Sequence, residues 1–99
     1  MNSNEYHLNN FLQELCEEAN AALKIPIQEE RENAFNYTIQ RMFINIRYSA
    51  LYFSRDVFLY WNCKEDDIKR DVLGNPEKYI VEVSDDLQEH PGLVIHFKK

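Results

Sequence analysis

The chain contains a stretch of 47 residues, 27–73, that has no glycine and no proline. These two residues are the ones that most often end a helix or turn the chain, so their absence favours continuous regular structure. The same stretch holds nine of the 13 aromatic residues in the protein. It predicts one long helix, or two helices joined end to end, through the middle of a small domain.

The apolar residues of this stretch recur mostly in steps of three and four, which is the spacing of a helix face. One stripe consists of Phe35, Ile39, Met42, Ile46, Ala50, Phe53, Val57 and Tyr60. Steps of two, which a half-buried strand requires, occur at Ile44, Ile46 and Tyr48. No turn residue lies nearby, so we discount a strand there, although a break near Ser49 or Ser54 fits the pattern.

A second stripe makes the predicted helix apolar on more than one face. Its members are Tyr37, Ile44, Tyr48, Leu51, Tyr52, Phe58 and Leu59. A helix of this kind is buried centrally or faces a second chain. We expect the aromatic-rich helix to use its apolar residues for folding, which would leave an acidic exterior as the means of contacting other molecules.

The segments on either side complete the predicted fold. The first segment forms an amphipathic helix that Asn4 or Ser3 could cap and that ends at Ile25-Pro26-Ile27. Residues 64–73 form a short polar helix that ends at Gly74. Residues 78–84 and 93–97 read as two strands of a terminal hairpin with an acidic loop between them; a helix from Pro76 onward is the alternative. The expected fold is mainly α (α+β), a single domain over residues 1–99, with three to four helices around the long central one.

Charge is distributed unevenly along the chain. Residues 1–24 carry four acids and one base, residues 25–63 four of each, and residues 64–99 nine acids and six bases. Both ends are therefore acidic, the middle is neutral, and the net charge is −6. Because phosphate groups are bound by an excess of Lys and Arg, nucleic acid and anionic membrane are poor partners, and a basic protein suits the chain better.

The cellular setting is predicted from what the termini and cysteines lack. Residues 1–10 have neither the basic region nor the apolar run of a signal peptide, and no apolar stretch approaches the length of a membrane span. The two cysteines, Cys16 and Cys63, do not form a dense disulfide framework. We expect a cytoplasmic protein.

Few residues suggest catalysis or a metal site. The acids next to Cys16 disfavour its thiolate, and the three histidines, His7, His90 and His96, have no ligand-like spacing. A phosphate-binding loop is nearly excluded because the chain has only two glycines. We therefore predict no enzyme activity, no cofactor and no metal. A small enzyme that combines the carboxylates with His90 or His96 is the weakest hypothesis.

The remaining interpretation is a protein-binding module. Inhibitors and immunity proteins that neutralise a basic enzyme such as a nuclease toxin, by occluding it, have this small, acidic character. Charge steering and a few aromatic anchors would provide the binding. The predicted contact residues are Asp66, Asp67, Asp85, Asp86, Glu89, Trp61, Tyr60 and Tyr52. The alternative is a structural or adaptor subunit that forms a homodimer through the second stripe of the central helix.

Overall fold

The computed structural model describes residues 3–99 and contains four α-helices and three strands. In chain order the elements are α1 (Ser3–Leu23), α2 (Gln28–Asn45), β1 (Ala50–Phe53), α3 (Arg55–Tyr60), α4 (Glu65–Gly74), a 3-10 turn (Pro76–Lys78), β2 (Tyr79–Val83) and β3 (Gly92–Phe97). The predicted class, mainly α with a small β component, is confirmed. Within residues 3–99, no helix is long and apolar enough to span a membrane.

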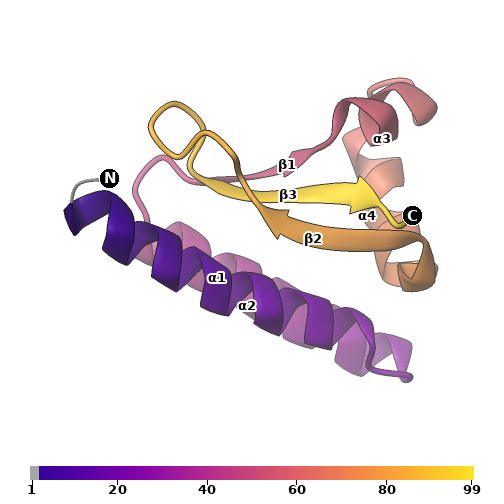
Figure 1. Ribbon diagram of the computed structural model, residues 1–99. Coiled ribbons are helices and arrows are strands. Elements are labelled where there is room, and N and C mark those ends of the chain that lie inside the picture. The colour runs from indigo at the N-terminus through magenta and orange to yellow at the C-terminus, as the bar shows by residue number, and fades with distance from the viewer. Residues whose placement is uncertain (1–2) are drawn as a thin grey trace.

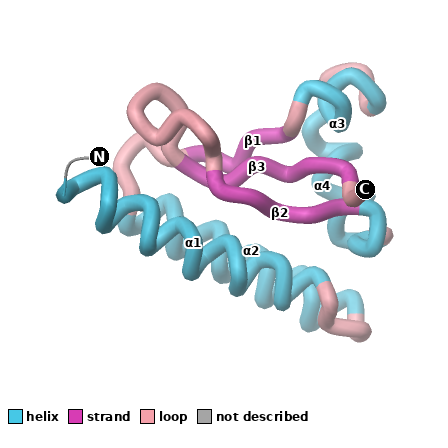
Figure 2. Tube along the Cα trace, in the orientation of Figure 1, coloured by secondary structure: helices cyan, strands magenta, loops and turns pink. Residues whose placement is uncertain are grey.

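The helices are arranged around one face and one end of the sheet. Figure 1 shows α1 and α2 running side by side beneath the sheet, with α3 and α4 at the end where β1 and β3 finish. Among the strands, α1 contacts mainly β2, and α2 contacts β1. Figure 2 shows the loop between β2 and β3 at the opposite end of the sheet from α3 and α4.

The sheet has the strand order β1-β3-β2. Strands β2 and β3 pair antiparallel, with Val81 opposite Ile95, so the predicted C-terminal hairpin and its acidic loop are confirmed. Strand β1 pairs parallel with β3, with Leu51 opposite Leu93. This third strand was not expected, and it lies inside the stretch that was predicted to be helical.

The core lies between the helices and the sheet. Side chains that alternate along the strands point toward it, as Val81, Leu93 and Ile95 do at 1% exposure or less. The helices cover them with residues spaced three and four apart. These are Leu12, Leu15 and Ala19 of α1, Phe35, Ile39 and Met42 of α2, and Ile68 and Val72 of α4.

The prediction of one long central helix, or of two joined end to end, is wrong. Helix α2 ends at Asn45 although no glycine or proline is near. Two polar side chains satisfy its last carbonyls: Asn45 Nδ2 donates to the Arg41 carbonyl at 2.8 Å, and Ser49 Oγ donates to that of Ile46 at 2.8 Å. The chain can leave the helix here because these carbonyls remain hydrogen-bonded.

A break was anticipated near Ser49 or Ser54, and the chain changes structure at both places. Tyr48 takes a φ of 63°, a left-handed conformation that more commonly falls to glycine, and this turns the chain into β1. Ser54 then caps α3, its Oγ accepting from the Val57 N–H at 3.3 Å. The apolar stripe predicted across this region is therefore divided between α2, β1 and α3, and its second half is not one helix face.

Arg31 fixes the position of α4 relative to the α1–α2 turn. Its guanidinium donates to the carbonyls of Ile25 at 2.9 Å, Leu73 at 2.7 Å and Pro26 at 3.2 Å. A planar guanidinium can reach carbonyls from two separate segments at once. The sequence alone does not indicate this role, because Leu73 is 42 residues from Arg31.

Candidate functional site

The face of the sheet that points away from α1 and α2 carries no buried side chain. In register, Tyr52 of β1 lies beside Val94 of β3, and Val94 lies beside Glu82 of β2; His96 and Ile80 form the next pair. These residues alternate with the buried ones, so strand geometry alone places them on the other side. We call Tyr52, Ile80, Glu82, Val94 and His96 the open sheet face.

The formal charges within the hairpin and its loop are all acidic. Residues 79–97 include four acids, Glu82, Asp85, Asp86 and Glu89, but no Lys or Arg, and β1 has no charged residue. His96 Nε2 lies 3.8 Å from Glu82 Oε2, so the one histidine of the open sheet face is beside a carboxylate. The lysines at positions 78, 98 and 99 lie outside residues 79–97, at the other end of the hairpin.

The acidic loop at the edge of this face is held by its own hydrogen bonds. The Asp86 carboxylate accepts from the Glu89 N–H at 3.2 Å, and the Asp86 carbonyl accepts from the His90 N–H at 2.8 Å. The His90 ring packs edge-on against Tyr52, with ring centroids 5.7 Å apart. The fold therefore brings together Tyr52, Asp86 and Glu89, three of the predicted contact residues, with Asp85 exposed in the same loop.

The other predicted contact residues lie at the opposite end of the molecule. Asp66 and Asp67 are in the first turn of α4, and Tyr60 and Trp61 are at the end of α3 (Figure 1). Asp67 forms an ion pair with Arg70 at 3.0 Å, and Tyr60 is 70% exposed. The eight predicted residues are thus divided between the two ends of the sheet and do not form one continuous cluster.

Trp61 is part of a hydrogen-bonded chain that joins α3, α4 and β2. Its indole N–H donates to Tyr79 Oη at 3.2 Å, and the Tyr79 hydroxyl donates to Asp71 Oδ2 at 2.5 Å. Asn75 Nδ2 donates to the other oxygen of Asp71 at 2.9 Å. Burial, and then the bond to Asp71, raises the pKa of Tyr79 to about 12. These hydrogen bonds stabilise the packing of α3 and α4 on β2.

We expect the protein to lose stability between pH 10 and pH 12 through Tyr79. The hydroxyl ionises near pH 10 when unfolded but only near 12 when folded, so the folded state keeps a proton that the unfolded state has lost. This contribution of about 2 kcal/mol is complete below pH 10 and disappears as the pH rises through 12. Denaturant unfolding of wild type and Tyr79→Phe across this range measures it.

The control for this prediction is Tyr6→Phe, which removes one phenol from an exposed position in α1, away from Tyr79. Subtracting its pH profile accounts for the general effect of losing a tyrosine. Phenolate absorbance of the folded protein gives a second readout, because the last tyrosine to ionise should be missing from Tyr79→Phe. Equal slopes for wild type and Tyr79→Phe above pH 10 would contradict the assignment.

The Cys16 side chain of α1 lies against the β2 edge of the sheet. The Cys16 thiol donates to the Val81 carbonyl at 3.0 Å, and burial, with the charges of Glu82 and Glu17, raises its pKa. The side chain therefore stays protonated, and a protonated thiol is a weak nucleophile. Among the residues described, no three His, Cys, Asp or Glu side chains lie close enough together to hold a metal ion.

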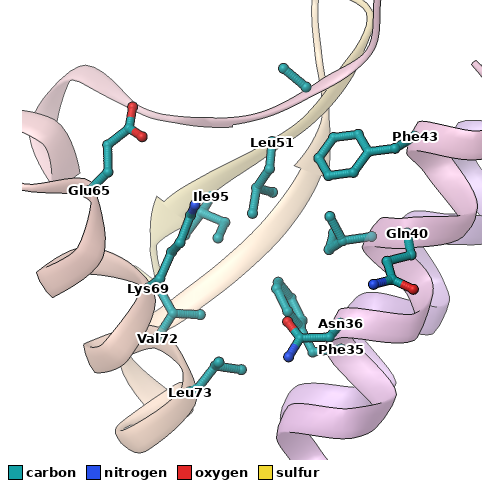
Figure 3. A pocket seen from close by; sticks show the side chains of 12 residues that line it. Phe35, Asn36, Gln40, Phe43, Leu51, Glu65, Lys69, Val72, Leu73 and Ile95 are labelled. Carbon is teal, nitrogen blue, oxygen red and sulfur yellow. The ribbon is translucent and has the colours of Figure 1, made fainter. Parts of the chain in front are cut away.

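A groove of about 640 Å³ lies on the helical side of the sheet, between α2 and α4. Figure 3 shows Phe43 and Gln40 of α2 facing Glu65 and Lys69 of α4 across it, with Leu51 and Ile95 between them. Its lining is mostly apolar, and its one cation and one carboxylate are both on α4. The sequence did not predict this groove, because it depends on how α4 packs beside α2.

Several large apolar side chains remain exposed on α2 and the turn that follows it. Tyr37 is 65%, Phe43 50%, Ile44 79% and Tyr48 79% exposed, and we call these four the α2 patch. Arg47 stacks on the Tyr48 ring, with its Cζ 4.9 Å from the ring centroid. The expectation that folding would consume the apolar residues of this region, leaving only acids outside, is therefore wrong.

The open sheet face itself was missed, although its signal is present in the sequence. Ile80, Glu82, Val94 and His96 alternate with the apolar residues of the two predicted strands, so they belong to the outer side once the hairpin is accepted. Compared with protein-family models, curated proteins and solved structures, the chain matches none of them. Its function is accordingly inferred from its own charges and geometry.

Proposed function

We propose that this chain is a cytoplasmic protein-binding module that occludes a basic protein, in the manner of an inhibitor or of an immunity protein for a nuclease toxin. The observation that carries the proposal is the open sheet face: a side of the sheet without buried residues, bordered by an ordered acidic loop, in a 19-residue segment that has no Lys or Arg. A cationic surface is the complement of such a face.

The charges would act first, during encounter. A protein of net charge −6 whose hairpin carries four acids and no Lys or Arg attracts a basic partner over about one Debye length, roughly 8 Å at physiological salt. The loop needs little reordering when it binds, because Asp86 already fixes the Glu89 and His90 backbone. A preordered loop saves the entropy cost that a flexible one would incur on binding.

Aromatic side chains would then provide contact area. Tyr52 lies on the open face between the loop and Val94, where its ring is half-buried and held against His90. Tyrosine is enriched at the centres of interfaces because its ring buries area while its hydroxyl forms hydrogen bonds. Tyr60, at the other end of the sheet, is the most exposed of the three predicted aromatic contact residues.

The test is capture of a basic protein that recognises this face. Immobilised wild type and the triple variant Glu82→Gln, Asp86→Asn, Glu89→Gln are exposed to lysate of the source cells at low and high salt. We expect wild type to retain a basic protein at low salt, and the triple variant to bind it at least tenfold more weakly. If the retained protein is a nuclease, wild type should inhibit it at stoichiometric amounts.

A matched control separates this face from net charge alone. Glu29→Gln, Glu30→Gln and Glu77→Gln also remove three exposed carboxylates, but from α2 and the 3-10 turn. This variant should bind nearly as wild type does, after its melting temperature confirms that it folds. Equal weakening by the two triple variants, or retention of no basic protein, would refute the proposal.

A further inference from the structure

The two edge strands of the sheet, β1 and β2, differ in whether their outward backbone groups are hydrogen-bonded within the chain. At the β2 edge, the Asn20 side chain of α1 acts as a substitute strand: its Nδ2 donates to the Val81 carbonyl at 2.8 Å, and its Oδ1 accepts from the Val81 N–H at 2.9 Å. Both edge groups of Val81 are therefore paired within the chain. An edge covered in this way cannot add a further strand at that point.

The β1 edge has no such cover. The Ala50 N–H donates to Pro91 at 3.1 Å and the Ser54 N–H donates to Ile95 at 2.9 Å, so these residues face β3. Backbone groups alternate along a strand, which turns the N–H and C=O of Leu51 and Phe53 away from β3. Within residues 3–99 no hydrogen bond is made by these four groups.

We propose that β1 pairs antiparallel with β1 of a second copy of this chain, forming a continuous sheet of six strands across a twofold axis. The register follows from which groups point outward. Leu51 of one copy lies opposite Phe53 of the other, so their free N–H and C=O groups exchange hydrogen bonds in both directions. Tyr52 lies on the axis beside its own symmetry mate, as a pair without hydrogen bonds whose side chains are close.

Charge favours a second copy as the occupant. Two chains of net charge −6 repel each other, and the repulsion is least where the surface is neutral. Residues 48–54 carry no charge at all, and residues 25–63 have as many bases as acids. Neither the Lys, Pro nor bulge that commonly protects an edge strand from self-pairing is present in β1.

The α2 patch lies on the element that leads into this edge. A twofold axis perpendicular to the sheet makes the two α2 helices antiparallel, so the acidic start of one, with Glu29 and Glu30, lies at the same end of the dimer as Arg47, which follows the last turn of the other. Antiparallel copies therefore place unlike charges at corresponding ends. The exposed Phe43, Ile44 and Tyr48 would provide apolar area beside the joined strands.

This pairing adds to the proposed function but does not depend on it. A twofold axis perpendicular to the sheet keeps both open sheet faces on the same side, so the dimer would present one acidic surface of double width. Self-association can be tested with the purified protein alone, whereas the proposed function requires a basic partner. Failure of either one leaves the other standing.

Sedimentation equilibrium over a wide range of concentration tests the proposal, using Tyr52→Lys as the disrupting variant. Two lysines would then face each other on the axis, and we expect dimer formation to weaken about tenfold or more. Val94→Lys is the matched control, since Val94 lies beside Tyr52 on the same face but one strand in from the edge. It adds the same charge and should weaken the dimer far less.

Two further measurements follow the interface directly. Mixing Tyr52→Lys with Tyr52→Glu should restore dimers, because unlike charges then meet on the axis. Amide hydrogen exchange should show the Leu51 and Phe53 N–H groups becoming protected as the concentration rises, while that of Tyr52 is protected throughout. These alternate residues report pairing at the β1 edge and at no other surface.

Three outcomes would overturn the proposal. The first is a monomer at every concentration, and the second is a dimer that Tyr52→Lys and Val94→Lys weaken equally. The third is a dimer in which the Leu51 and Phe53 amides exchange as freely as in the monomer. If those amides become protected only when a different protein is added, the edge belongs to that protein and self-pairing is refuted.

Discussion

Gly92→Ala is expected to lower the free energy of unfolding by about 3 kcal/mol, the sum of a strained backbone and a close contact. Gly92 has a φ of +149°, which side-chain-bearing residues rarely adopt, and a Cβ atom there would lie 2.0 Å from the Ala50 carbonyl oxygen. The clash is with backbone, so it cannot be relieved by a change of rotamer. It would force β1 away from β3 at the point where the parallel pair begins.

Urea unfolding followed by circular dichroism measures this loss, with Gly74→Ala as the control. Gly74 is the last residue of α4, and a Cβ atom there would meet nothing within 4 Å. Alanine at such a site restricts the unfolded chain and should be neutral or stabilise by up to about 1 kcal/mol. Equal effects of the two substitutions would show that β1 does not approach β3 this closely.

Asn20→Ala should cost about 2 kcal/mol, because it leaves a buried backbone N–H without a partner. The Asn20 amide makes both a donor and an acceptor bond with Val81, which is 1% exposed. The Val81 carbonyl keeps the Cys16 thiol as a donor at 3.0 Å, whereas its N–H has no second acceptor among the residues described. The loss should appear as a lower midpoint of denaturant unfolding with an unchanged slope.

Asn10→Ala on the same helix is the matched control. Asn10 is exposed, so this substitution mainly replaces asparagine by a better helix former, which should stabilise α1 by several tenths of a kcal/mol. The two variants should therefore differ in sign. If Asn20→Ala were as stable as Asn10→Ala, the side chain would contribute nothing to the β2 edge, and the contrast between the two edges of the sheet would disappear.

The two edges and the open face together suggest how the fold divides its surfaces. Asn20 covers the β2 edge at Val81, whereas the two proposals assign a basic protein to the open sheet face and a second copy of this chain to the uncharged β1 edge. The capture, sedimentation and amide-exchange experiments examine these surfaces one at a time.

The candidate site could be predicted only in part. The acids of the hairpin loop were identified from the sequence, and the fold places Asp86 and Glu89 next to Tyr52 through the His90 ring. Asp66, Asp67, Tyr60 and Trp61 were grouped with them by composition, yet they lie beyond the other end of the sheet. Distance along the chain gives no measure of distance across a sheet.

The sequence by itself determined the elements whose signals are local. Pro26 and Gly74 ended α1 and α4 near the predicted places, and β-branched residues gave the terminal hairpin around a loop rich in acids. In each case the residues that specify the element lie within it or next to it, so no information from the rest of the chain was required.

The secondary structure of residues 46–60 was decided only by the tertiary structure. Their apolar spacing fits a helix, but Ala50–Phe53 gain a parallel partner in β3 some 40 residues later, where Gly92 admits the Ala50 carbonyl. Burying Ile46 while pairing Ala50 requires the chain to leave the helix between them, through the left-handed Tyr48. Weak local propensity was overridden by hydrogen bonds and packing with a distant strand, which periodicity along the chain does not reveal.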